Sequence, residues 1–309
     1  MTRFHSAMLI LNPHAHNASQ IDVEAAGRQI EKAGVATSVV VPDSIEASTK
    51  ALQEAVEGGR DVVFMAGGDG TLRQAARALG NTDTALAPIP LGTANVLAKE
   101  LGIPRDWQEA IEAHLQGQTQ AMDVGWAGDE PFLAMASIGW DAEVAANVNL
   151  AVKKRAGAAA YVLSGAQRLR NLLAPKLLEG TLDHVEAVGD SSILVISNTR
   201  NYGGVVEFTP NALADDGVFD LCAVKPRNLL HGLQLIVRLM RRSLSEDDLT
   251  SYGQASHAVV ETPDVTVQVD GDVIGETPMT FTLATRALKI SVPAGALPPI
   301  FGDSEKPAS

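Results

Sequence analysis

Short apolar runs alternate with amphipathic stretches along the first 116 residues, and this alternation constrains the fold more than any other feature. The apolar runs have the length of strands and cover 7–11, 35–41, 61–66 and 85–90. The stretches between and after them carry apolar residues at helical spacing and cover 20–33, 44–57, 71–79, 94–101 and 106–116. Strands that alternate with helices are typical of a parallel sheet covered by helices. The sequence therefore predicts an α/β lobe with a parallel sheet over residues 1–120.

The pattern changes after Gly117, where strand-like segments separated by Gly, Pro, Asp and Asn turns dominate. These segments are 121–126, 132–138, 192–198, 218–224, 258–261, 265–269 and 287–292. Two helical stretches interrupt them, at about 157–173 and 228–242. Such a pattern is typical of mainly antiparallel β structure. We therefore expect a second, β-rich lobe over 121–300 and a flexible polar tail over 301–309.

The composition excludes several classes of protein. With 24 Lys and Arg against 37 Asp and Glu, the formal net charge of −13 argues against nucleic acid as a partner. A single cysteine, Cys222, cannot form an intramolecular disulfide, and we expect it to be a buried apolar residue. The N-terminus lacks the flanks of a signal peptide, and no apolar run reaches the ~18 residues of a membrane-spanning helix. We expect a cytoplasmic protein, soluble or peripheral to the inner face of the membrane, and the sequence leaves a homodimer open.

The sharpest functional signal is a glycine-rich segment, Ala66-Gly67-Gly68-Asp69-Gly70-Thr71, between an apolar run and a helix expected to start near Leu72. Glycines allow φ > 0 and let backbone amides approach an anion, because no Cβ is in the way. The helix N-terminus adds partial positive charge, and Thr71 can cap it. We therefore predict a phosphate-binding loop. The alternative is an ordinary glycine turn between a strand and a helix.

Asp69 is unusual inside a phosphate-binding loop, because a carboxylate repels a phosphate. A magnesium ion resolves the conflict, since hard divalent cations bridge carboxylates and phosphate oxygens. The alternative is an Asp that stabilises its own turn through backbone hydrogen bonds.

Residues 88–95, PIPLGTAN, repeat the arrangement of an apolar strand, a Gly-Thr turn and a helix. Asn12 follows the first strand at the corresponding end. The carboxyl ends of parallel strands meet at one edge of the sheet, where open α/β sheets bind ligands. We therefore expect Asn12, the Gly67–Leu72 loop and Thr93 to converge on one site.

Five segments together resemble the diacylglycerol kinase catalytic-domain family, which includes bacterial soluble lipid kinases, ceramide kinases and sphingosine kinases. They are LILNP, GGDGT, PLGTANVLAKELGIP, FTPNALADDGVFDL and VQVDGD, and the resemblance spans about residues 7–293. It implies a nucleotide-binding lobe like those of phosphofructokinases and NAD kinases, a C-terminal β-sandwich lobe and an active site between them. It also implies that ATP with Mg²⁺ binds through the Gly67–Leu72 loop, assisted by Asn12 and Thr93. The acceptor would be the hydroxyl of diacylglycerol or a related lipid alcohol.

In this family an Asp-Gly-Glu segment supplies the proton acceptor for the lipid hydroxyl, and the matching residues here are Asp270, Gly271 and Asp272. The resemblance therefore makes Asp272, Asp270 and Asp69 the candidate catalytic residues. Asp272 stands where Glu is usual, so its carboxylate is displaced by the loss of one methylene. Read from the residues alone, the segment is a β-hairpin tip with two solvated carboxylates.

Leu213-Ala214-Asp215-Asp216-Gly217-Val218 is a second acidic turn. Some bacterial relatives bind a structural magnesium here, and the resemblance assigns it to the Asp216 side chain and the carbonyls of Leu213 and Val218. The alternative is a type I turn with Asp and Gly in their favoured places.

A lipid acceptor predicts basic residues that meet anionic headgroups at a membrane surface. Such residues lie on or just before the two helical stretches, and they are Lys153, Lys154, Arg155, Arg168, Arg170, Arg227, Arg238, Arg241 and Arg242. The alternative is that they are solvated helix faces.

The loop after the first strand, residues 12–17, lacks the glycines that relatives carry, and the roles of His14 and His16 stay open. Together with the unusual Asp272, this departure leaves two alternatives to a lipid kinase. One is a kinase acting on a soluble hydroxyl compound such as NAD, and the other is a nucleotide-binding regulatory protein without turnover.

Overall fold

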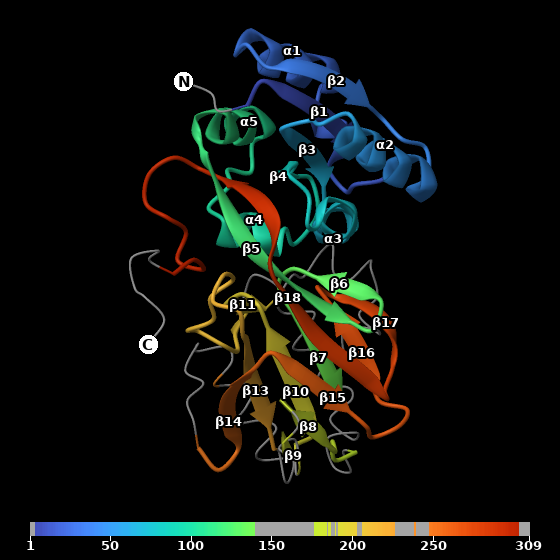
Figure 1. Ribbon diagram of the computed structural model, residues 1–309, viewed down its shortest axis with the longest axis vertical. Coiled ribbons are helices and arrows are strands. Elements are labelled where there is room, and N and C mark those ends of the chain that lie inside the picture. The colour runs from blue at the N-terminus through green and yellow to red at the C-terminus, as the bar shows by residue number, and fades with distance from the viewer. Residues whose placement is uncertain are drawn as a thin grey trace. The chain divides into compact units, whose positions relative to one another are not determined.

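The computed structural model describes residues 4–139, 176–183, 185–186, 189, 191–202, 206–225, 238 and 247–302. The described residues form two compact units (Figure 1). The first comprises those within Met1–Val124, Ala214–Asp216 and Ala284–Ser309, and the second those within Gly125–Leu213 and Gly217–Leu283. The helices predicted at 157–173 and 228–242 lie outside the described residues, apart from Arg238. The predicted boundaries at residues 120 and 300 stay a prediction.

The first unit is built on a parallel sheet in the order β2-β1-β3-β4-β18. Its N-terminal strands are β1 (Ser6–Leu11), β2 (Ala36–Val40), β3 (Val62–Gly67) and β4 (Ala85–Pro90). The fifth is the last part of β18 (Met279–Val292), where Ile290 pairs with Leu86 of β4. The four strands predicted in this lobe are therefore confirmed to within two residues at each end.

Helices cover both faces of this sheet. They are α1 (Val23–Lys32), α2 (Ile45–Glu57), α3 (Asp69–Leu79), α4 (Val96–Glu100) and α5 (Trp107–Gln116), with a short 3₁₀ turn at Ala18–Gln20. Side chains at three N-caps fix where helices begin, because Asp22, Ser44 and Asp106 accept hydrogen bonds from first-turn amides. Helix α1 packs with α5, and α2 packs with α3 (Figure 1).

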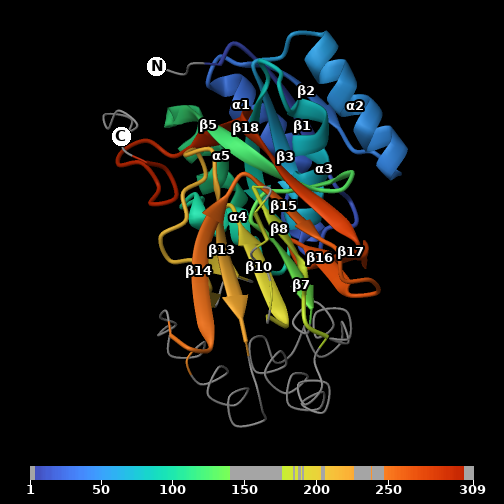
Figure 2. The same cartoon turned by 60° about the horizontal axis from the view of Figure 1, so that its bottom comes forward.

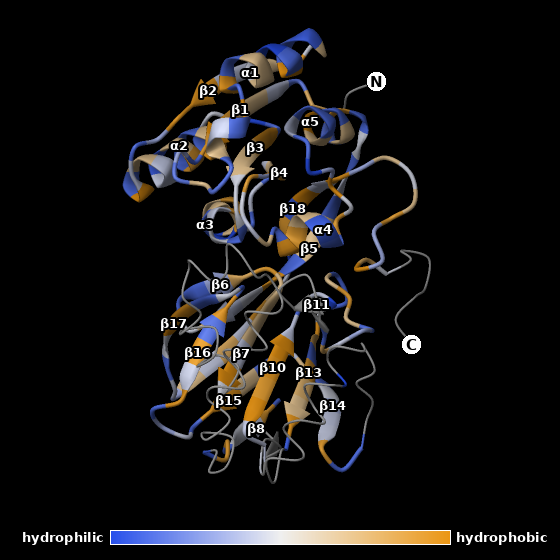
Figure 3. Ribbon diagram, turned by 180° about the vertical axis from the view of Figure 1, so that it is seen from behind, coloured by the Kyte–Doolittle hydropathy of each residue, from blue (hydrophilic) through white to orange (hydrophobic). Residues whose placement is uncertain are grey.

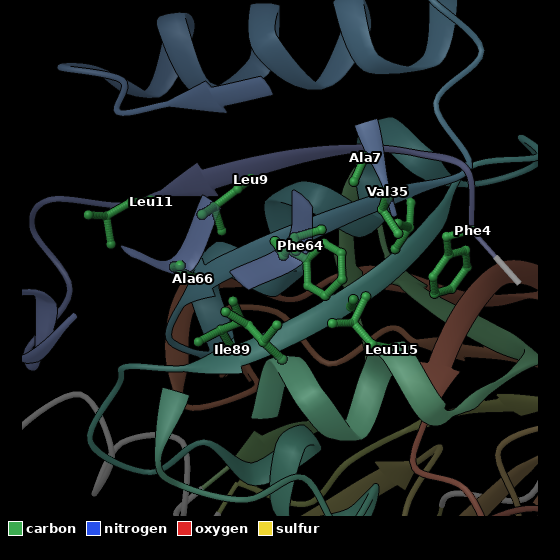
Figure 4. Packing of buried hydrophobic residues seen from close by; sticks show 14 of the residues in the cluster. Phe4, Ala7, Leu9, Leu11, Val35, Phe64, Ala66, Ile89 and Leu115 are labelled. Carbon is green, nitrogen blue, oxygen red and sulfur yellow. The ribbon is translucent and has the colours of Figure 1, made fainter. Parts of the chain in front are cut away.

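Because helices cover both faces, β3 and β4 are buried along their whole length and β1 from Ala7 onward, rather than alternating. Figure 4 shows one side of this core, where Phe64 and Ile89 of the sheet lie beside Leu115 of α5. Burying a side chain such as Leu9 or Phe64 stabilises the fold by about 1.5–3 kcal/mol. The core thereby fixes the strand ends from which the candidate site is built.

One buried polar side chain, His114 of α5, connects this core to two strands. Its Nε2 lies 2.8 Å from the Pro88 carbonyl oxygen and its Nδ1 lies 2.9 Å from Ser291 Oγ. A carbonyl only accepts, so Nε2 carries the proton and Nδ1 accepts from the Ser291 hydroxyl. Complete burial lowers the pKa of His114 to about 4, so the ring is neutral at pH 7.

The second unit is a β-sandwich. One sheet has the antiparallel order β14-β13-β10-β7-β16-β17, and its strands lie side by side in Figure 2. Their bounds are β7 (Met135–Gly139), β10 (Ile193–Ser197), β13 (Phe219–Val224), β14 (Thr250–Ala255), β16 (Thr266–Val269) and β17 (Asp272–Glu276). A separate two-stranded pair consists of β11 (Asn201–Tyr202) and β12 (Val206–Glu207).

The facing sheet of the sandwich follows the order β6-β5-β18-β15-β8-β9. Its strands other than β18 are β5 (Gln118–Ala127), β6 (Glu130–Phe132), β8 (Gly180–Leu182), β9 (Val185–Glu186) and β15 (His257–Val260). Both sheets contribute to one apolar layer, in which Phe132 stacks on Phe219 with ring centroids 5.5 Å apart. The predicted fold class, a parallel α/β lobe plus an antiparallel β-sandwich, is confirmed.

Strand β10 of this unit is fully buried and is coloured as hydrophobic along most of its length in Figure 3. Its neighbour β13 contains Cys222, which is buried, as expected from the sequence. Among the helices that the structure describes, none is both long enough and apolar enough to cross a bilayer.

Candidate active site

Three loops leave the carboxyl ends of β1, β3 and β4 and meet at one edge of the first sheet. These edge loops are residues 12–17, 67–71 and 91–95. Strand β1 lies between β2 and β3, so the chain changes direction across the sheet between β1 and β3, which is where open α/β sheets bind ligands. Backbone bonds join the loops at this edge: Asn12 N donates to Ala66 O at 2.9 Å, and Leu91 N donates to Gly67 O at 2.8 Å.

The first and second edge loops are also joined through side chains. Asn12 Nδ2 donates to Thr71 Oγ1 at 2.8 Å, and Asn12 Oδ1 accepts from the His14 amide at 2.9 Å. Thr71 is buried within the first turn of α3, whereas His14 and His16 are exposed. The predicted meeting of Asn12 with the glycine-rich loop is therefore confirmed. The predicted helix start was wrong: α3 begins at Asp69 with Gly68 as its N-cap, so Thr71 does not cap it.

The glycines of the loop are needed because backbones pack closely there, not because the chain adopts positive φ. The prediction that they provide φ > 0 was therefore wrong. Gly68 has φ −102°, a value open to any residue. A Cβ on Gly68 would lie 3.1 Å from the Cα of Gly92, and a Cβ on Gly92 would lie 2.6 Å from the Cα of Gly68. A Cβ on Gly67 would lie 2.6 Å from that of Thr71. The second and third edge loops thus touch through their backbones, and side chains would force them apart.

Helix α3 presents its N-terminus at this edge. The amides of Thr71 and Leu72 donate to Gly68 O at 2.9 and 3.0 Å, and the side chain of Leu72 is buried. Gly70 lies in the same first turn, whose orientation gives the loop partial positive charge. An anion such as a phosphate is therefore favoured here.

Asp69 contacts a backbone amide outside its own turn, which differs from the predicted alternative of an Asp that stabilises only that turn. Its Oδ1 accepts a hydrogen bond from the Leu97 amide at 3.4 Å, at the start of α4. Lys99 on the same helix is within electrostatic reach: partial burial and then the charge of Arg105 lower the pKa of Lys99, while Asp69 opposes this by raising it. Asp69 therefore joins the second edge loop to the third. Any role toward Mg²⁺ is additional to this contact.

The third edge loop is closed by a residue that the sequence reading did not select. Asn95 has a left-handed backbone, with φ 48°, and its side chain bonds both backbone groups of Gly92, at 2.8 Å to N and 2.9 Å to O. Asn17 of the first edge loop donates to the same Gly92 carbonyl at 3.3 Å. Thr93, a predicted nucleotide contact, is exposed in this loop. An Asn just before a helix was the available signal, because Asn tolerates this conformation.

The N-terminus of α3 suits the oxygens of a phosphate. The described residues contain no group of three or more His, Cys, Asp or Glu side chains that could hold a metal ion. Mg²⁺ accepts a carboxylate together with phosphate oxygens, so Asp69 stays a candidate ligand for magnesium bound with a nucleotide.

In the second unit, Asp270 and Gly271 form the two-residue turn between β16 and β17. Both have positive φ, 49° and 92°, which is the type I′ geometry that favours Asp-Gly. The hairpin expected from the residues alone is therefore confirmed. Asp272 is exposed as the first residue of β17.

The two carboxylates of this turn are not equivalent. Asp270 is partly buried, and its oxygens accept hydrogen bonds from the amides of Leu133, Ala134 and Met135 at 2.9, 2.9 and 3.0 Å. The expectation of two solvated carboxylates was therefore wrong for Asp270. The geometry gives Asp270 an anchoring role and leaves Asp272 as the carboxylate at the surface.

The predicted magnesium-binding residues Leu213, Asp216 and Val218 lie in an irregular segment before β13. Asp216 is exposed, and Gly217 has φ 81°. Next to them, Asp215 Oδ1 accepts from the Gly302 amide at 2.9 Å. A magnesium ion at this segment stays a prediction.

Of the basic residues that were predicted to meet headgroups, the structure describes Arg238. Its guanidinium pairs with the Asp247 carboxylate. The others lie outside the described residues.

Comparisons with known proteins match both units. Residues 6–127 match the model of the diacylglycerol kinase catalytic domain, and residues 134–292 match that of the YegS C-terminal NAD kinase beta sandwich-like domain. A "Probable lipid kinase YegS-like" of Pseudomonas putida is 33% identical over 94% of this chain and 96% of its own length. The "Diacylglycerol kinase" of Bacillus subtilis is 28% identical over 86% of this chain and 89% of its own.

A solved structure supports the fold independently. A crystal structure of a diacylglycerol kinase from Bacillus anthracis str. Sterne superposes with a TM-score of 0.73, covering 95% of this chain and 99% of that one at 22% identity. The resemblance read from the motifs is thus matched along nearly the whole sequence. The chain belongs to the diacylglycerol kinase catalytic-domain family, in the form that couples this domain to a YegS-type β-sandwich.

Proposed function

We propose that this protein is an ATP-dependent lipid kinase, which transfers the terminal phosphate of ATP to the hydroxyl of diacylglycerol or a related lipid alcohol. The observation that carries the proposal is the direct contact of Gly68 with Gly92, which combines two helix-preceding loops into one surface at the sheet edge. Family membership supports a phosphotransferase, and relatives named as lipid kinases support a lipid acceptor.

In this proposal the edge loops hold the nucleotide phosphates. The N-terminus of α3, within the Gly67–Leu72 loop, binds the anionic oxygens, while the amides of Thr71 and Leu72 donate to Gly68 O and, with the Asn12–Thr71 pair, fix the loop in place. Thr93 adds an exposed hydroxyl. Mg²⁺ bound with ATP would neutralise phosphate charge, and Asp69 is the carboxylate that we propose meets it.

Asp272 is the proposed proton acceptor on the lipid side. The lipid oxygen forms a bond to the terminal phosphorus, the bond from phosphorus to the bridging oxygen of ADP breaks, and the hydroxyl proton passes to the Asp272 carboxylate. Asp270 holds the turn that presents Asp272. Because phosphoryl transfer depends mainly on positioning and charge, the shorter Asp272 can serve where relatives use Glu.

The lipid acceptor implies contact with a membrane surface. We propose peripheral contact at the inner face, with ATP and Mg²⁺ supplied from the cytoplasm. The proposed structural magnesium at Leu213, Asp216 and Val218 would brace the segment that leads into β13.

Incubation with labelled ATP, Mg²⁺ and a total lipid extract tests the proposal, with the product identified by mass. We expect one phosphorylated lipid from the wild type and none from Gly68→Val. Gly253→Ala is a matched control, because a Cβ there meets nothing within 4 Å. Transfer to NAD without lipid would favour a soluble acceptor. Tight ATP binding without turnover on any acceptor would favour a regulatory protein.

A further inference from the structure

Gln268 is a buried polar residue on β16, two residues before the Asp270-Gly271 turn, with 1% of its surface exposed. Its Nε2 donates to Ser137 Oγ of β7 at 2.6 Å. Its Oε1 accepts from the Gly271 amide at 2.7 Å. The side chain therefore connects a fixed strand in the sheet to the turn that precedes Asp272.

The orientation of this amide follows from its partners. A backbone N–H only donates, so the oxygen of Gln268 must face Gly271 and the nitrogen must face Ser137. Ser137 is fully buried and lies directly opposite Gln268 in the pairing of β7 with β16. Ser137 thus provides a rigid support for the Gln268 amide.

The turn is held from both sides. Asp270 binds the amides of residues 133–135, and Gln268 binds the amide of Gly271. The pairing of β16 with β17 shifts register between Val267 and Gln268. A register shift alters strand direction locally, so hydrogen bonds beyond the ladder add to the turn in fixing where β17 begins. Asp272 is the first residue of β17.

We infer that Gln268 is a positioning residue for Asp272: through the Gly271 amide and Ser137 it sets where the Asp272 carboxylate meets the acceptor hydroxyl. This inference rests on the proposed function. Its importance follows from the sensitivity of catalysis to geometry, since a displacement of about 1 Å can cost about a hundredfold in rate. The shorter side chain of Asp272 makes the position of its backbone correspondingly more important.

The test uses Gln268→Met, which keeps the length of the side chain and removes both hydrogen bonds. We expect kcat for the lipid to fall about ten- to a hundredfold, while the KM for ATP stays within about twofold. Val260→Ala, a core truncation on β15, is the matched control for destabilisation of the same unit. A comparable loss of kcat in folded Val260→Ala would assign the effect to stability and overturn the inference.

A double-mutant cycle with Asp272→Ala provides the decisive comparison. If Gln268 acts through Asp272, Gln268→Met should cost almost nothing further in the Asp272→Ala background. If the fold-losses of kcat in the two single variants multiply in the double variant, the inference is overturned, while the kinase proposal stays intact. Exchange of the Gly271 amide proton is a readout independent of turnover, and unchanged protection in Gln268→Met would also overturn it. A wild type without turnover on any lipid would instead overturn the kinase proposal itself.

Discussion

Two turns of similar composition, Gly68-Asp69-Gly70 in the first unit and Asp270-Gly271-Asp272 in the second, use glycine for different physical reasons. Gly68 has an ordinary φ of −102° and is required because the backbone of Gly92 lies against it. Gly271 has φ 92° and open space around it, so it is required for its conformation. In the first turn a side chain is therefore excluded by lack of space, and in the second by the backbone angle φ.

The aspartates of the two turns also differ, in the hydrogen bonds that their carboxylates accept. Asp69 accepts from the Leu97 amide at the start of α4, at 3.4 Å, whereas Asp270 accepts from three consecutive amides at 2.9 to 3.0 Å. A carboxylate with several strong amide partners serves the fold first. The comparison indicates that Asp270 holds its turn against residues 133–135, whereas the contact of Asp69 joins two edge loops.

The largest effect is expected from Gly68→Val. The β-branched side chain would collide with the Gly92 backbone, separate two edge loops and abolish measurable ATP binding. Isothermal titration calorimetry on the folded variant checks this. ATP affinity equal to that of wild type would show that the loop contact has no role in binding. Gly271→Ala should leave ATP affinity unchanged, because it strains only the other turn.

Asp272→Ala should reduce the transfer rate by roughly a hundred- to ten-thousandfold, the usual range for a positioned acid or base, with ATP affinity within a few-fold. Asp272→Glu should retain or raise activity, because it restores the reach that relatives use. Steady-state kinetics on the identified lipid measure both. Full turnover by Asp272→Ala would place the base elsewhere, with Asp69 as the next candidate.

Asp69→Asn should mainly lower the transfer rate, whereas Asp270→Asn should mainly lower the free energy of unfolding. Asp69→Asn should lower transfer at least about a hundredfold with little change in the free energy of unfolding, because it removes the charge that we propose for magnesium binding. Asp270→Asn should cost about 1–3 kcal/mol in stability, because an amide is a weaker acceptor for three N–H groups. Urea denaturation beside kinetic assays tests the pair. Equal stability losses in both variants would contradict the contrast between the two turns.

The last prediction, which expects no effect at neutral pH, is a pH dependence of stability that arises from His114 in the first unit. Burial holds the pKa of His114 at about 4, below its ordinary value of 6.5, so the unfolded chain binds a proton that the folded one excludes. Stability should be complete above about pH 6.5 and fall by up to about 3 kcal/mol as the pH drops toward 4. Urea denaturation at several pH values measures this. If His114→Gln keeps the same pH dependence, another group is responsible.

The parallel lobe could be predicted closely from sequence because its inner strands β1, β3 and β4 are buried on both faces and read as nearly continuous apolar runs. The β-sandwich was harder. Strands β14 and β17 carry exposed polar residues, and β8, β9, β11 and β12 are two or three residues long, too short for a periodic signal. The strand predicted at 287–292 is the end of the much longer β18.

Site residues could be predicted where a short sequence motif marks them. They could not be predicted where their role depends on contacts with residues distant in sequence. The motifs indicated Asn12, the glycine-rich loop and the Asp-Gly turn. The bonds of Asn17 to Gly92 and of Gln268 to Ser137 join residues 75 and 131 positions apart, and nothing in the local sequence marks them. The sequence also did not show why residue 68 must be glycine, because its side chain is excluded by Gly92, in a loop that follows another strand.

Strand β18 makes the first unit discontinuous along the gene. Its last residues complete the sheet beside β4, although the residues of the second unit separate them from the rest of that sheet in sequence. A fragment ending at residue 124 would therefore lack a strand, and β4 would become an unpaired edge open to association with other chains. The first unit and its edge loops therefore cannot be isolated by a single cut, because their unit is assembled from three separate stretches of the sequence.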